Sequence, residues 1–371
     1  MTTHAKLSAS GSARWINCPG SVAAEENFPN TTSIFAEEGT AAHELAEIVL
    51  SEGGSTFNWE GRFLPENNTN PVTQEMCNYI QDYVDYVRLI KGELLVEQRV
   101  DFSSWVHEGF GTCDAIVIDG SHLHIVDLKY GKGVPVYAED NTQAILYALG
   151  AYSDYDMIHD IQQVTVSIVQ PRLNNISEWS LSLADLLLWG ERISQAAQAT
   201  QEDAAPRVPS EKACQWCKAK ATCPALHAKA EKLMLSNFDD FDAANPDSLT
   251  HEQLVQVLKG KKLLMAWLEA VEDYATFQLK AGKDFAGYKL VAGRSLRAWG
   301  DDEAAEKILI KVLGEAAFSK KLISVAQAEK TLGKGKTQTI DGLIVKPEGA
   351  PTLAPNSDPR PSVNISPASF D

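Results

Sequence analysis

Two aspartates and a lysine form the group of side chains in this sequence that is best suited to chemistry. Asp127 and Lys129 lie two positions apart in an apolar segment, and Asp114 begins another apolar segment shortly before it. Because side chains alternate along a strand, Asp127 and Lys129 point to the same face, and a hairpin would bring Asp114 beside them. Two carboxylates placed so closely repel each other unless a divalent cation lies between them. With the lysine, such a group could support metal-assisted hydrolysis of a phosphodiester.

The segments around these residues predict alternating helices and strands. The turn sequence Asp119-Gly120-Ser121 separates two short apolar runs, and Asn141 or Thr142 can cap a following helix. The expected order is helix, three strands, helix and strand, over residues 36–51, 94–100, 113–119, 122–129, 139–150 and 164–170. This order predicts an α/β fold with a mixed central sheet.

Further groups on these elements could join the three side chains. His43 would supply a nitrogen ligand, which favours Mn²⁺ relative to an all-oxygen site, and the carbonyl oxygen of Leu128 could add another ligand. Gln143 and Tyr147 are four residues apart on one side of a predicted helix, so they could position a substrate strand or a water. The alternatives are a satisfied surface histidine and ordinary helix packing. Glu97 on the preceding strand is an additional candidate.

With these motifs in this order, the chain resembles the PD-(D/E)XK nuclease superfamily, and within it the RecB/AddB-type and CRISPR-adaptation nucleases. The family motifs fall on Gly39 to His43, Asp114, Asp127 with Lys129, and Gln143 with Tyr147. The pattern Ser-x-Ser-x-x-x-Arg-Trp-x-x-Cys-Pro at residues 8–19 is similar to that of a group of phage and prophage proteins. The resemblance implies a restriction-endonuclease-like αβββαβ core over residues 1–235 and a catalytic Mg²⁺ or Mn²⁺. In that reading, His43, Asp114, Asp127 and Leu128 are the metal ligands, and Lys129, Gln143 and Tyr147 act beside them.

The cysteines give an independent signal. Cys214, Cys217 and Cys223 have the spacing C-x2-C-x5-C, and Cys18 is a remote fourth thiol. Three clustered thiols with a distant one could bind a 4Fe-4S cluster, and a zinc ion is the alternative. The resemblance implies the 4Fe-4S cluster, which would connect the N-terminal segment to the end of the nuclease core in a structural role. The other two thiols, Cys77 and Cys113, are expected to be buried.

The amino-acid composition limits which partners and which cellular location we expect for the protein. The 371 residues carry a formal net charge of −17, which is unusual for a protein that binds nucleic acid. Local basic segments occur at residues 212–220, 259–262 and 294–297, and these could contact DNA. No run of eighteen apolar residues and no signal peptide is found, so we expect a cytoplasmic protein without a membrane span, as for a phage-encoded protein in a bacterial host.

The C-terminal third is predicted to be mainly helical and to end in a polar tail. A long amphipathic helix is expected to run to about residue 280, a short extended pair to occupy residues 284–299, and two more helices to lie at 302–313 and 324–332. Residues 240–336 are therefore interpreted as a mainly helical accessory domain. Residues 337–371, rich in proline, serine and asparagine, are interpreted as a disordered tail.

The resulting hypothesis is a metal-dependent DNA nuclease, specifically an exonuclease that acts on single-stranded DNA or DNA ends in phage recombination or replication. A phage single-strand-binding or annealing protein is a candidate partner. Two alternatives stay open at this point. One is a non-catalytic DNA-binding or assembly module on a nuclease-like fold, and the other is a nuclease that trims DNA for a CRISPR integrase.

Overall fold

The computed structural model of the chain describes residues 5–28, 34–67, 69–235, 251–289 and 311. The chain divides between Leu290 and Val291 into two units, and all elements named below belong to the first. The helices and the end of the extended pair predicted beyond residue 289, and the tail predicted at residues 337–371, lie outside the described residues except for residue 311. The predicted domain boundaries therefore stay predictions.

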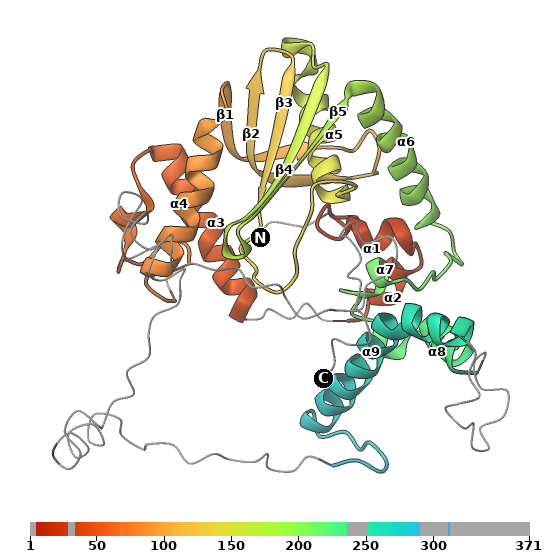
Figure 1. Cartoon of the computed structure of the whole chain (residues 1–371). Helices are drawn as coiled ribbons and strands as arrows, with labels where there is room; N and C mark the ends of the chain where they lie inside the picture. The colour runs from red at the N-terminus through yellow and green to blue at the C-terminus, as the bar shows by residue number, and fades with distance from the viewer. Residues whose placement is uncertain (1–4, 29–33, 68, 236–250, 290–310, 312–371) are drawn as a thin grey trace, which may run out of the picture. The chain divides into compact units, whose positions relative to one another are not determined.

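A five-stranded mixed sheet forms the centre of the first unit, and its strands lie side by side in chain order (Figure 1). β3 and β4 run parallel, whereas the other neighbouring pairs are antiparallel. This arrangement confirms the predicted α/β class and the predicted order of helix, three strands, helix and strand. The strands are β1 (Glu93–Asp101), β2 (Phe110–Asp119), β3 (His122–Leu128), β4 (Gln163–Gln170) and β5 (Asn175–Ser182).

The hairpin between β2 and β3 follows from its turn sequence. Asp119 pairs with His122, and Gly120 between them has a φ of +60°. Glycine adopts this left-handed conformation without the steric cost that a side chain would add. The hairpin fixes the register that brings the end of β3 close to the start of β2.

The parallel pairing of β3 with β4 requires a crossover, which α5 (Thr142–His159) provides. Asn141 caps this helix, because its Oδ1 accepts hydrogen bonds from the backbone N–H groups of Gln143 and Ala144. The predicted cap is therefore confirmed, and it places Gln143 in the first turn of α5.

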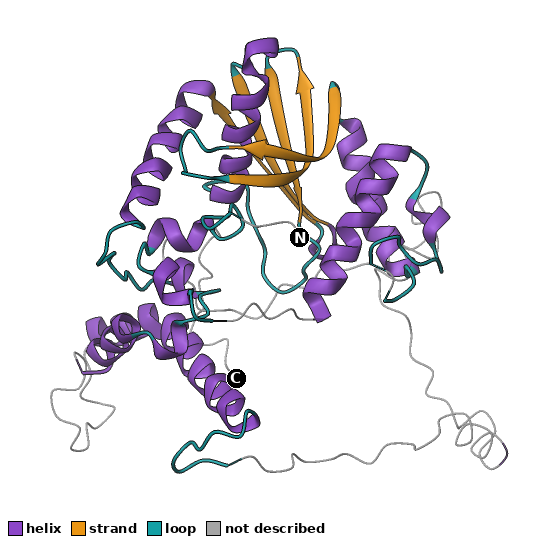
Figure 2. Ribbon diagram, turned by 180° about the vertical axis from the view of Figure 1, so that it is seen from behind, coloured by secondary structure: helices purple, strands orange, loops and turns teal. Residues whose placement is uncertain are grey.

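Helices cover both faces of the sheet (Figures 1 and 2). Val126 and Leu128 of β3 enter a core with the first helix pair, while Leu123 and Ile125 enter a second core with the other pair. Adjacent residues thus enter opposite cores, as in a strand that is buried on both faces. The first pair is α3 (Ile34–Glu52) with α4 (Gln74–Leu89), and the second is α5 with α6 (Leu183–Ala199).

The other elements are short, apart from one long helix near the end of the first unit. They are α1 (Ser12–Asn17), α2 (Ser21–Glu25), η1 (Thr56–Trp59), η2 (Pro171–Leu173), α7 (Glu211–Cys214), η3 (Lys220–Thr222), α8 (Pro224–Leu235) and α9 (His251–Lys280). The end of α9 agrees with the predicted helix. Among the helices that the structure describes, none is both long and apolar enough to span a membrane.

Candidate active site

The first part of the site lies between β1 and β2. Val96 pairs with Ala115 and Gln98 with Cys113, so Glu97 and Asp114 lie opposite each other between these two regular pairs. Glu97 has a φ of 46°, in the left-handed region that side chains other than glycine rarely occupy. The ladder is therefore distorted at the position where two carboxylates meet.

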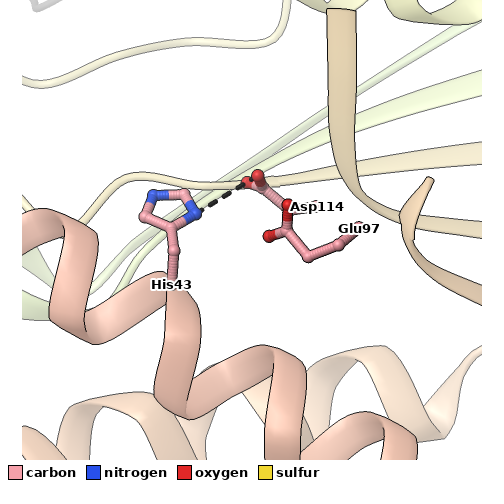
Figure 3. A group of neighbouring side chains, drawn as sticks. All are labelled: His43, Glu97 and Asp114. Carbon is pink, nitrogen blue, oxygen red and sulfur yellow. Dashed lines mark ion pairs between the residues drawn. The ribbon is translucent and has the colours of Figure 1, made fainter. Parts of the chain in front are cut away.

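The second part comes from helix α3. His43 Nδ1 lies 3.2 Å from Asp114 Oδ1, and His43 points toward this carboxylate with Glu97 beside it (Figure 3). Each of the three residues offers a ligand atom, and these atoms all lie within 4.8 Å of one another. One nitrogen and two carboxylate oxygens at this spacing could bind a divalent cation.

Asp114 also connects this group to the end of β3. Its Oδ2 accepts a hydrogen bond of 2.6 Å from the backbone N–H of Leu128, the residue between Asp127 and Lys129. The side chain of Leu128 is buried in the apolar core beside α3 and α4. The backbone N–H of Leu128 therefore holds Asp114 in place. The proposal that the carbonyl oxygen of Leu128 binds a metal stays a prediction.

Asp127 and Lys129 form a largely buried ion pair. Asp127 is only 1% exposed, and Lys129 Nζ lies 2.8 Å from its Oδ2. Even so, within the described part of the chain Oδ2 accepts no hydrogen bond of good angular geometry. The ion pair is close, but Oδ2 keeps the capacity for another partner.

Lys129 is held from a second side by helix α5. Its Nζ donates a hydrogen bond of 2.9 Å to Gln143 Oε1, and Gln143 Nε2 donates one of 3.1 Å to the hydroxyl of Tyr147. Tyr147 is buried, and a Cβ at Gly111 would come within 2.7 Å of its ring, so β2 leaves space for this tyrosine. The predicted Gln143–Tyr147 pair thus reaches the predicted lysine.

The electrostatics of the site reflect several carboxylates in a small volume. Burial raises the pKa of Asp127, and Lys129 offsets part of this rise. Burial, followed by Asp114, raises the pKa of Glu97 to about 8. For His43 and Lys129, burial lowers the pKa, but the neighbouring carboxylates outweigh it and both pKa values are raised. The apo site therefore favours extra protons, which a bound cation could replace.

Glu97 is the member of the site that sequence reasoning weighted least. The sequence indicates it only as an acidic residue on a predicted strand, and the predicted ligands are His43, Asp114, Asp127 and Leu128. The group within 4.8 Å contains Glu97 and not Asp127. The signal that could have found it is register, because Glu97 is the residue of β1 that faces Asp114.

A cavity apart from this site is lined by all four cysteines of the predicted cluster, Cys18, Cys214, Cys217 and Cys223. Within the described residues, no three of their sulfur atoms lie within 4.8 Å of one another. A tetrahedral zinc ion would hold sulfur atoms about 3.8 Å apart, whereas a 4Fe-4S cluster binds each thiolate to a different iron and spaces them more widely. The metal at this cavity stays a prediction.

The four thiols of this cavity line an open space, whereas the two remaining thiols lie inside the apolar cores. Burial raises the pKa of Cys217 to about 12 and also raises that of Cys214. Without a cation, Cys214 and Cys217 are therefore protonated at neutral pH. Cys77 and Cys113 are buried in the two apolar cores, as predicted.

Two comparisons with known proteins complete the description. A solved structure titled "Crystal structure of SSO0001" aligns over 57% of this chain and 83% of its own, with 16% sequence identity and a TM-score of 0.27. The model of a family described as "Protein of unknown function (DUF2800)" matches residues 4–361. The match covers nearly the whole chain, so the chain belongs to this family.

Proposed function

We propose that this member of the DUF2800 family is a metal-dependent nuclease that hydrolyses phosphodiester bonds in DNA, on a fold of the PD-(D/E)XK type. The observation that carries the proposal is the convergence of His43, Glu97 and Asp114 within 4.8 Å, with the Asp127–Lys129 pair joined to Asp114 through the backbone of Leu128. The alternative is a set of salt bridges that only stabilises the fold, but such a set does not require a histidine and three carboxylates close together.

The residues present fit a divalent cation. The buried Oδ2 of Asp127 lacks a well-formed hydrogen bond, and the pKa values of Glu97 and Asp127 are raised because negative charge is concentrated without full compensation. His43, Asp114 and either Glu97 or Asp127 would hold the ion, which we expect to be Mg²⁺ or, because of the imidazole, Mn²⁺. When bound, such an ion would neutralise charge on the phosphate and make a water more acidic.

The protein's own residues would act on the substrate around this ion. Lys129 stays charged, since its pKa is raised, and two partners, Asp127 and Gln143, fix its ammonium group. A cation so fixed can orient the attacking water and stabilise the negative charge that develops on the phosphate oxygens. Gln143, itself held by Tyr147, would limit the motion of Lys129 during the reaction.

DNA as the substrate class is supported by the distribution of charge rather than its sum. The net charge is −17, yet Arg207 and Lys220 line the thiol cavity, and Lys212 and Lys218 lie close to its cysteines in the chain. Glu211 in this segment is paired with Lys262 of α9 at 3.2 Å, which neutralises it. Trp216 is 76% exposed between two of the cysteines, where a base could stack on its ring. This surface could contact the phosphates and bases of a DNA strand.

At the thiol cavity we extend the proposal to a 4Fe-4S cluster with a structural role, with zinc as the alternative. The cavity is lined by the four predicted thiols, and a bound cation would lower the raised pKa values of Cys214 and Cys217. Iron, sulfide and zinc content of anaerobically purified protein would decide between them. Cys217→Ser should remove the metal, whereas the buried Cys77→Ser should retain it.

Cleavage of end-labelled single- and double-stranded DNA by the full chain, with Mn²⁺ or Mg²⁺, tests the activity. Asp127→Ala and Lys129→Ala should abolish cleavage, whereas Asp119→Ala and Lys132→Ala, which remove exposed charges on the same hairpin and the following loop, should retain it. Equal cleavage by wild type and Asp127→Ala would show that the site is not the catalytic centre. Metal-dependent DNA binding without any cleavage would instead favour a non-catalytic binding module.

A further inference from the structure

The N-terminal segment, residues 8–19, contains a dense pattern of serine, arginine, tryptophan and cysteine that the proposed chemistry does not use. In the structure this segment builds α1. Ser8 Oγ accepts a hydrogen bond from the backbone N–H of Gly11, and Trp15, fully buried in the core beside α5, donates from Nε1 to the carbonyl of Ser8. The pattern therefore folds a short helix and fixes it to the core.

The start of α1 contacts the start of α5. Ser12, only 1% exposed, places its Oγ 2.7 Å from Oγ1 of Thr142, which is the first residue of α5. Gln143 follows directly, and its side chain accepts the hydrogen bond from Lys129. A hydroxyl pair, buried at Ser12 and half-buried at Thr142, thus lies one residue away from the amide that holds the proposed catalytic lysine.

The end of α1 contacts the thiol cavity. Cys18, the C-cap of the helix, lines the cavity, and its Sγ accepts a hydrogen bond of 3.2 Å from the backbone N–H of Val208. The backbone N–H of Gly20 donates to Pro206, and a Cβ at Gly20 would lie only 2.4 Å from the carbonyl oxygen of Ala205. This end of α1 is therefore tightly attached to the segment before α7.

A second attachment reinforces that end. Arg14 pairs with Glu25 of α2 at 2.9 Å, and the other oxygen of Glu25 accepts a hydrogen bond of 2.7 Å from the backbone N–H of Lys218, next to Cys217. With about 1.5 Å of rise per residue, a six-residue helix spans only about 9 Å. Such a short, doubly attached helix transmits a displacement at one end to the other.

From these contacts we propose that Ser12 is a positioning residue for Gln143 and Lys129, and that α1 couples the thiol cavity to the catalytic end of the sheet. The coupling rests on the proposed nuclease function. Ser12 touches neither substrate nor metal ligands. It fixes the first turn of α5, so that Gln143 keeps the ammonium group of Lys129 in place. Loss of metal from the cavity would loosen α1 and lower turnover without removing any catalytic group.

Four substitutions test the positioning role. Ser12→Ala and Thr142→Val each remove one hydroxyl of the pair, Thr142→Ser keeps the hydroxyl, and Thr56→Val is the matched control. Thr56 is equally buried, and its hydroxyl donates a hydrogen bond of 2.7 Å to the carbonyl of Cys77, away from the site. The variants thus separate loss of a buried hydroxyl from loss of this particular contact.

We expect Ser12→Ala and Thr142→Val to lower kcat by roughly ten- to a hundredfold while KM stays within about twofold, because misplacement of a catalytic group acts on the chemical step. Thr142→Ser and Thr56→Val should retain kcat. A Ser12→Ala protein whose kcat matches that of Thr56→Val would overturn the proposal.

Hydrogen exchange gives a readout that does not need activity. Amides of residues 141–147 should exchange faster in Ser12→Ala and in Cys18→Ser than in wild type, but not in Thr56→Val. If Cys18→Ser loosens residues 205–218 and leaves residues 141–147 unchanged, the two ends of α1 are not coupled. Should wild-type protein fail to cleave DNA, the nuclease proposal is lost, whereas the exchange data still decide whether Ser12 holds α5.

Discussion

Glu97 faces Asp114 across the β1–β2 ladder, at a point where the backbone of Glu97 turns into the left-handed region. A non-glycine residue in that conformation costs free energy, of order 1–3 kcal/mol, that the surroundings must offset. Such distortions concentrate at functional sites, and here the distortion places a second carboxylate beside the Asp114–His43 pair. Glu97 therefore belongs to the proposed metal site more directly than its position in an edge strand suggests.

The first prediction concerns Glu97 and pH. Its pKa in the folded apo protein is about 8, above the value near 4.5 of an unfolded chain. The folded apo state therefore binds the extra proton, and its free energy of unfolding falls as pH rises from about 4.5 through about 8. Because a metal ligand must be deprotonated, Mn²⁺ should raise Tm more at about pH 8.5 than at about pH 6.

Thermal unfolding with and without Mn²⁺ across this range measures the effect. Glu97→Gln should flatten the pH dependence of the apo protein and weaken Mn²⁺ binding. Glu93→Gln, which changes an exposed glutamate on the same strand, is the control. A Glu97→Gln protein with the wild-type response to Mn²⁺ at both pH values would remove Glu97 from the site.

The second prediction separates the two roles of Lys129. Lys129→Met leaves the buried carboxylate of Asp127 without its cation, and breaking a buried pair in this way costs about 3–5 kcal/mol. Mn²⁺ should restore much of that stability, because a bound ion compensates Asp127, but it should not restore cleavage. Denaturant unfolding and cleavage assays on one protein sample check both outcomes, with Lys132→Met as control.

Recovery of cleavage in Lys129→Met on adding Mn²⁺ would show that the ammonium group serves stability alone. The proposed orientation of water by Lys129 would then be wrong, even if the metal site itself is correct.

Much of the fold follows from local patterns. The turn at Gly120, the cap at Asn141 and the alternating apolar runs predicted three strands, a helix and a fourth strand, and the structure has them in that order. α4, β5 and α6 were not identified. β5 is an eight-residue edge strand in which exposed residues alternate with half-buried ones up to the buried Leu181, and its polar composition resembles that of a loop.

Local patterns predicted the site where chemistry and neighbouring sequence coincide, whereas His43, Gln143 and Tyr147 were predicted with the help of the family resemblance. Asp114, Asp127 and Lys129 lie on one hairpin, so their proximity follows from the turn. Glu97 depends on the register across the eight-residue connection between β1 and β2, and Ser12 meets Thr142 across 130 positions. Contacts of this kind are set by packing of whole elements, which single-sequence periodicity does not specify.

The third prediction concerns Trp216 and DNA. Trp216 is 76% exposed, and lysines lie near it in the chain, so its ring is accessible for stacking with a base. Trp216→Ala should weaken single-stranded DNA binding by about 1–3 kcal/mol, the contribution of one stacked base. Fluorescence anisotropy with Ca²⁺ in place of Mn²⁺ measures this without cleavage. Phe63→Ala, which removes another exposed aromatic, should bind normally, and equal binding by Trp216→Ala would exclude stacking there.

The last prediction concerns two histidines of β3, on the sheet face that α3 and α4 cover and near the turn between β2 and β3. The rings of His122 and His124 on β3 are stacked with centroids 3.8 Å apart, and His122 Nε2 lies 2.9 Å from Thr165 Oγ1. Burial lowers the pKa of both histidines, and the neighbouring His122 lowers that of His124 further. Asp119 opposes the shift at both histidines, and Glu178 also opposes it at His124. The unfolded chain therefore takes up protons first, so these histidines lower the free energy of unfolding as pH falls below about 6.5.

The pH dependence of stability from these histidines has the opposite sign to that from Glu97, so the effect of the histidines should be measured in a Glu97→Gln background. Urea unfolding at about pH 7.5, 6.5 and 5.5 should show a loss of stability that His124→Asn reduces, because the substitution removes an imidazole whose pKa is lowered by burial and then by His122. His107→Asn, at an exposed loop histidine, should leave the loss unchanged. An identical pH dependence in His124→Asn and His107→Asn would mean that the stacked pair does not titrate with unfolding.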